Sequence, residues 1–63
     1  MPEKLAYQIP EAVIVSGVGR TSLYREIAAG RLETITVGRR RLVPRVSLEE
    51  WLDRLRREQR ESA

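Results

Sequence analysis

The chain has 63 residues, no cysteine and no histidine, and a formal net charge of +3. A chain of this length forms one domain with a thin core, since it hides only about 60% of the surface that its unfolded form exposes. The missing residue types exclude disulfides and make a zinc site implausible. They also remove the commonest general bases and thiolate nucleophiles, so we expect no enzyme activity, no metal and no cofactor. No apolar run is long enough for a signal sequence or a membrane span, so we expect a cytoplasmic protein without a membrane partner.

Positive charge gathers in the middle of the chain. Residues 20–45 contain seven arginines and only two acidic residues, Glu26 and Glu33. Arginine outnumbers lysine eleven to one in the whole chain, and its planar guanidinium suits phosphate oxygens and guanine edges better than an ammonium does. A GC-rich coding bias also raises arginine content everywhere, so the placement of the arginines must decide their meaning.

The N-terminal segment predicts an arm followed by a helix. Residues 1–8 contain Pro2 and show little periodicity, which indicates a flexible arm. A helix is expected from Ile9 onward, because Pro10 suits its first position and Glu11 suits the positive end of the helix dipole.

The body of this first helix is ambiguous in composition. Residues 13–15 are all β-branched, which taken alone favours a strand. The segment is short, however, and stops at Gly17. We therefore interpret it as a helix with Ala12 and Val15 on its buried side.

The second helix is better marked. Gly19 is an acceptable N-cap, and Gly30 is well placed just beyond the C-terminal end. At about 100° per residue, Leu23 and Ile27 define the buried direction. The opposite face is short, polar and cationic, and it carries Thr21, Ser22, Arg25 and Ala29.

The periodicity then changes to that of a β-hairpin. Residues 34–37 alternate polar and apolar, residues 38–39 can form a two-residue turn, and residues 40–43 return. This register pairs Ile35 with Leu42 and Thr36 with Arg41, and Pro44 ends the second strand.

The predicted hairpin needs support and has a basic tip. A two-stranded ribbon is not stable alone, so we expect it to pack on the helices through Ile35, Val37 and Leu42. The turn and the start of the second strand then expose three consecutive arginines, Arg39, Arg40 and Arg41.

The last helix shows the strongest local signals. Residues 47–50 form a capping box with Ser47 as the N-cap, and Val46 with Trp51 completes a hydrophobic staple. Apolar residues then recur at i, i+3, i+4 and i+7 and predict one buried stripe: Leu48, Trp51, Leu52 and Leu55. We expect the folded domain over residues 9–55 and a charged, fraying helical extension over residues 56–63.

These elements together predict a mainly α fold with a small β-hairpin, in the order helix-helix-hairpin-helix. Two helices joined by a tight glycine-containing turn match a helix-turn-helix, and a basic hairpin after them matches a wing. The run over residues 9–52, with EAxxxxGVxRTSLYxxIxxG and then VGRRRLVPRxxLEEWL, resembles the excisionase-type, MerR-like winged helix-turn-helix domain of small phage, plasmid and transposon proteins. It departs from that family at Gly19, where serine is usual.

The resemblance implies a set of DNA-binding residues. In it, the second helix enters the major groove of double-stranded DNA and the wing enters the adjacent minor groove. Arg25 is our candidate for a base-edge contact, whereas Thr21 and Ser22 suit phosphate or a thymine methyl group. The recognition-helix positions are Arg20, Thr21, Ser22, Tyr24 and Arg25, and the wing positions are Arg39, Arg40 and Arg41. Simpler interpretations remain: Tyr24 as part of the core, Arg20 as a helix-end charge and Arg40 as packed along the hairpin.

The resemblance also implies a function in DNA recombination. An excisionase, or recombination directionality factor, bends DNA and assists a tyrosine integrase in excision, and it can self-associate cooperatively on DNA. Its place would be the nucleoid of a bacterial or phage-infected cell. Two alternatives stay open: a small transcriptional repressor, and a protein-interaction module acting through the terminal amphipathic helix. The salt dependence of binding separates a DNA contact from an apolar protein contact.

Overall fold

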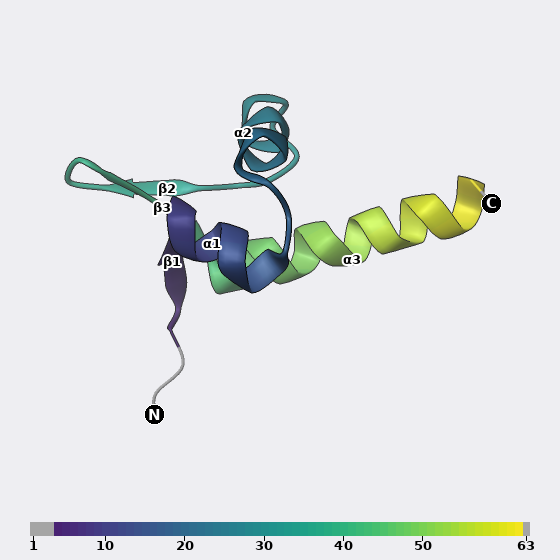
Figure 1. Ribbon diagram of the computed structural model, residues 1–63, viewed down its shortest axis with the longest axis horizontal. Helices are drawn as coiled ribbons and strands as arrows, with labels where there is room; N and C mark the ends of the chain where they lie inside the picture. Colours follow the sequence, from purple (N-terminus) through teal and green to yellow (C-terminus); the bar gives the residue numbers. More distant parts are fainter. Residues whose placement is uncertain (1–3, 63) are drawn as a thin grey trace.

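The computed structural model describes residues 4–62, which form three helices and one three-stranded antiparallel sheet (Figure 1). The elements in chain order are β1 (Ala6–Gln8), α1 (Ile9–Ser16), α2 (Arg20–Ala28), β2 (Ile35–Val37), β3 (Arg40–Pro44) and α3 (Arg45–Ser62). The hairpin of β2 and β3 and the C-terminal end of α3 extend to opposite ends of the molecule, and α2 lies above α1 and α3 in this view. This architecture confirms the predicted winged helix-turn-helix.

Strand β1 is the main addition to the predicted elements. Residues 6–8, which the sequence assigns to a flexible arm, pair antiparallel with β3 in the sheet order β1-β3-β2. The Arg45 backbone N–H extends this ladder by donating to the Leu5 carbonyl at 2.8 Å. The prediction of a flexible arm is therefore wrong for residues 6–8, because a non-local partner orders them. The arm's first three residues lie outside the described part of the chain.

The turn between α1 and α2 depends on a glycine. Gly17 has a φ of 74°, a left-handed conformation that glycine adopts without steric cost, and its N–H donates to the Val13 carbonyl at 2.9 Å. The Ser16 Oγ then accepts the Val18 N–H at 3.1 Å. Gly19 is the N-cap of α2, as predicted. These contacts fix the short connection on which the placement of α2 depends.

The core draws one or two residues from each helix, from β3 and from the segment after α2. Its buried members are Ile9, Ala12, Leu23, Leu32, Val43, Leu48 and Trp51. Trp51, with only 2% of its surface exposed, confirms the predicted placement of α3. Two predicted core positions are wrong: Val15 is 57% exposed and Leu52 is 37% exposed. Both lie at the margin of a core too small to cover a wider helical stripe.

The hairpin has the predicted register but not the predicted inner face. Ile35 pairs with Leu42 and Thr36 with Arg41, around a turn that begins at Gly38 with a φ of 63°. The buried residue of β3 is nevertheless Val43, while Ile35 is 48% and Val37 is 58% exposed. Alternation shows which residues share a face but not which face turns inward. The pairing of Val43 with Tyr7 of β1, both in contact with the core, marks the inner face.

Helix α3 differs from its prediction at both ends. It begins at Arg45, directly after Pro44, so Ser47 lies inside the first turn and is not the N-cap. Val46 is exposed and forms no staple with Trp51. The helix runs on to Ser62, and the charged extension is helical throughout its described residues. Within residues 4–62, no helix is both long enough and apolar enough to span a membrane.

Candidate nucleic-acid interface

The outward side of α2 presents hydroxyl and guanidinium groups. Leu23 is fully buried and anchors the helix, while Thr21, Ser22 and Arg25 are exposed, as the periodicity predicts. The first turn of α2 contains no acidic residue, and its Gly19 cap has no side chain. The N–H groups at this end, together with the positive end of the helix dipole, therefore favour an anion such as a phosphate.

Arg20 and Tyr24 form a pair at the same helix. The Arg20 Cζ lies 5.6 Å from the centroid of the Tyr24 ring, which is within the range of a cation–π contact. Tyr24 is exposed rather than buried in the core. The contact gives the Arg20 guanidinium a defined position on the helix surface. We call the exposed group Arg20, Thr21, Ser22, Tyr24 and Arg25 the α2 face.

The tip of the hairpin is cationic on both sides. Arg39 lies in the turn, and Arg40 and Arg41 pair with Val37 and Thr36. Successive residues of a strand point to opposite faces, so Arg40 and Arg41 project in opposite directions. All three arginines are exposed, and residues 34–44 contain no acidic residue. We call Arg39, Arg40 and Arg41 the wing tip.

The structure brings the eight predicted site residues together as two surfaces, not as one pocket. Five lie along α2 and three at the end of the hairpin, which extends away from the body of the molecule (Figure 1). Within residues 4–62, none of the eight forms an ion pair with an acidic side chain. Their charges are thus available to an anionic partner. Two separated basic surfaces fit an extended polyanion better than a small ligand.

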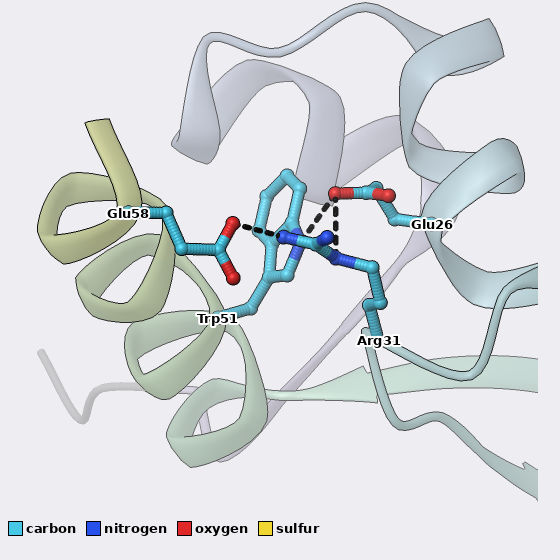
Figure 2. A network of polar contacts seen from close by, with 4 residues as sticks. All are labelled: Glu26, Arg31, Trp51 and Glu58. Carbon is cyan, nitrogen blue, oxygen red and sulfur yellow. Dashed lines mark hydrogen bonds and ion pairs between the residues drawn. The ribbon is translucent and has the colours of Figure 1, made fainter. Parts of the chain in front are cut away.

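A polar cluster on the inner side of α2 is absent from the sequence predictions. Glu26, Arg31, Trp51 and Glu58 contact one another where α2, the following segment and α3 meet (Figure 2). The members come from distant parts of the chain, and no local spacing connects them. Acidic residues within the basic middle of the chain are a weak signal, because Glu33 shares that feature with Glu26 and lies outside the cluster.

Comparison with known proteins agrees with this geometry. The model of the helix-turn-helix domain family matches residues 6–56, and the chain belongs to that family. Its fold is of a class that binds DNA with the second helix in the major groove. No solved structure matches the chain.

The chain is also similar to a curated protein that is named as a probable excisionase. A probable excisionase from Saccharopolyspora erythraea is 33% identical over 55 residues, which are 87% of this chain and 56% of that protein. The chain thus spans little more than half the length of this relative. The similarity and the family match together support the excisionase-type resemblance seen in the sequence.

Proposed function

We propose that this protein is an excisionase that binds a specific site in double-stranded DNA, bends it and so assists a tyrosine integrase in excision. The observation that carries the proposal is the pair of exposed, unpaired basic surfaces, the α2 face and the wing tip, on one small helix-turn-helix domain. The similarity to a probable excisionase supports the choice among DNA-binding functions.

In this proposal the α2 face enters the major groove. Arg25 lies mid-helix and exposed, and a guanidinium there can bind the O6 and N7 of a guanine. Thr21 and Ser22 lie in the first turn, where hydroxyl groups can donate to a phosphate. Arg20, held against Tyr24, is assigned to the DNA backbone. The middle of α2 then recognises bases, and the start of α2 positions the protein on the DNA backbone.

The wing tip enters the adjacent minor groove. Its three arginines can neutralise phosphates or enter a narrow groove, which reads the shape of the DNA and not individual bases. Bending a site of typical length costs roughly 1–6 kcal/mol. Contacts made by the wing tip offset part of that cost, because release of counterions favours each phosphate contact. Strand exchange itself is left to the integrase, and the protein contributes binding, bending and partner contacts.

A protein-interaction module is less well supported. That alternative needs the apolar stripe of α3 for a partner, but Leu48 and Trp51 of this stripe are buried in the protein's own core. The exposed side of α3 offers Val46 and Leu52 among charged residues, which is a poor surface for a helix-in-groove contact.

Footprinting over the DNA that flanks the protein's own gene tests the proposal. We expect protection of adjacent sites beside an attachment core, and anomalous mobility of circularly permuted fragments that reports bending. An operator at a promoter, without such sites, would indicate a repressor. Absence of any footprint at low salt would contradict DNA binding altogether.

A further inference from the structure

Apolar packing holds α2 at few points. Leu23 is its one fully buried residue, and Ile27 is partly buried. A surface groove of about 250 Å³ separates α2 from α3 and is lined by Val18, Ser22, Arg25, Glu26, Trp51 and Leu55. Apolar burial has no directional preference. One buried leucine beside an open groove therefore anchors α2 in place but constrains its rotation about its own axis only weakly.

Glu26 supplies the directional contact that the apolar residues lack. Its Oε1 accepts a hydrogen bond from the Trp51 Nε1 of α3 at 3.2 Å. The same oxygen lies 3.5 Å from the Arg31 Nε, an ion-pair contact rather than a hydrogen bond. Arg31 continues to α3, where its Nη2 donates to the Glu58 Oε1 at 2.5 Å (Figure 2). Both connections from Glu26 thus end on α3.

The backbone of Glu26 joins the same cluster. Its carbonyl accepts the N–H of Arg31 at 3.0 Å and the N–H of Leu32 at 3.3 Å. The chain after α2 is thereby folded back beneath the helix, which places the Arg31 guanidinium between Glu26 and Glu58 (Figure 2). Main chain and side chain of one residue therefore connect α2, the following segment and α3.

One guanidinium, that of Arg31, lies between the two carboxylates of the cluster. The hydrogen bond to Glu58 and the negative charges of Glu26 and Glu58 raise the pKa of Arg31 above its already high ordinary value. An arginine guanidinium is not deprotonated in proteins, so Arg31 carries a positive charge. Its positive charge offsets part of the negative charge of Glu26 and Glu58, which opposes a polyanion at the neighbouring α2 face.

We infer that Glu26 is a positioning residue for DNA recognition, whose contacts with Trp51 and Arg31 fix the rotation of α2 and hence the direction of Arg25. The inference rests on the proposed function. Neighbouring residues of an α-helix lie about 100° apart around its axis. Arg25 and Glu26 are adjacent, so any rotation that releases Glu26 from Trp51 turns Arg25 through the same angle. A hydrogen bond weakens steeply when its donor and acceptor are misaligned. The hydrogen bond from Trp51 to Glu26 therefore opposes such a rotation of α2.

The test measures sequence discrimination rather than affinity alone. A site is first selected by the unmodified protein from random-sequence duplexes, and the ratio of Kd on random duplex to Kd on that site is then measured. We expect Glu26→Ala to lower this ratio roughly 5-fold to 150-fold, the range for removing one base-specific interaction. Trp51→Phe, which removes the N–H donor and keeps a smaller aromatic ring, should lower it in the same direction.

Two variants control for charge and for the hydrogen bond. Glu33→Gln removes one negative charge from an exposed position outside the cluster and should leave the ratio unchanged. Glu26→Gln retains an oxygen that can accept from Trp51 and should keep most of the discrimination. Melting curves by circular dichroism set a temperature at which every variant is folded. If Glu26→Ala does not fold, Trp51→Phe and Glu26→Gln carry the comparison.

The outcomes separate this inference from the proposed function. If the unmodified protein selects no site, the proposed function fails and the inference fails with it. If it selects a site but folded Glu26→Ala or Trp51→Phe discriminates as well as the unmodified protein, Glu26 only stabilises the fold. An equal loss of discrimination in Glu33→Gln would likewise overturn the positioning role, since it would assign the effect to charge.

Discussion

Trp51 belongs to the core and to the polar cluster at once. Its ring is buried in a core to which all three helices and the sheet contribute, and its indole N–H donates to Glu26. A buried indole N–H without an acceptor would destabilise the fold, because no hydrogen bond would replace the one it makes with water in the unfolded chain. The position therefore requires both a large aromatic ring and a donor, and tryptophan provides both.

Trp51→Ala should unfold the domain. Removal of a buried tryptophan costs about 3–5 kcal/mol, and a domain this small has a total stability of only about 5 kcal/mol or little more. Circular dichroism would show loss of the helical signal at room temperature. Leu52→Ala is the control. Leu52 is the next residue along α3 and is 37% exposed, so its replacement should change the melting temperature little. A helical, cooperatively melting Trp51→Ala protein would contradict the assigned core.

Arg25→Ala should separate base recognition from general attraction. If the Arg25 guanidinium binds a base edge, its removal costs roughly 1–3 kcal/mol on the specific site and little on random duplex. Binding isotherms on both duplexes at one salt concentration measure this difference. Arg54→Ala on α3 is a matched control that removes the same charge away from the α2 face. Equal losses on both duplexes would make Arg25 a phosphate contact.

Among the helices and strands, sequence patterns correctly predicted the features that depend on residues close together in the chain. Adjacent strands joined by a two-residue turn fix their own register, so Ile35 and Leu42 were paired correctly. The inner face of that hairpin depends on β1, whose three residues are too short to show a period and pair with a distant strand. For the same reason the contact of Glu26 with Trp51 had no local signal. The exposure of Thr21, Ser22 and Arg25 needed only helical periodicity and was predicted correctly.

The junction of the N-terminal segment with α1 should respond to acid. Glu11 accepts hydrogen bonds from the Lys4 ammonium and from the Gln8 backbone N–H, and these lower the pKa of Glu11 below its ordinary value. A lowered pKa in the folded state stabilises the fold above the ordinary glutamate pKa, and this contribution is lost as pH falls through the lowered value.

Glu11→Gln should remove that part of the acid dependence. Its melting temperature should fall less than that of the unmodified protein as pH drops through the range below the ordinary glutamate pKa. Melting curves across this range measure the effect, and Glu61→Gln, on the exposed end of α3, is the control. Superimposable pH profiles for Glu11→Gln and the unmodified protein would show that the contact contributes nothing to folding.

Replacing Arg39, Arg40 and Arg41 by alanine should separate folding from binding. The wing tip is exposed and lies away from the core, so the melting temperature should change little. Affinity should fall on every sequence, and the slope of log Kd against log salt should become shallower by about one unit for each phosphate that the arginines no longer neutralise. Bending should decrease as well. Unchanged binding and bending would make the hairpin a structural element only.

The whole molecule should have a low free energy of unfolding in the absence of a ligand. Over residues 4–62 its core consists of seven buried residues, the chain has no cysteine to form a disulfide, and the hairpin and the end of α3 extend far from that core (Figure 1). A ligand that binds only the folded state stabilises it by mass action. In so small a domain, DNA binding should therefore add a large increment to the stability measured in its presence.

Specific duplex should raise the melting temperature strongly. At a free duplex concentration of 100 times Kd the stabilisation is about 2.7 kcal/mol, which corresponds to roughly 10–20 °C for a domain of this size. Random duplex at the same concentration binds more weakly and should shift the melting temperature less. Added salt should reduce both shifts, because each phosphate contact weakens as counterion release becomes less favourable. Melting curves followed by the fluorescence of Trp51 measure these shifts, since this residue is the protein's one tryptophan. Equal shifts with both duplexes would contradict sequence-specific binding, and shifts that ignore salt would contradict a contact made through arginines.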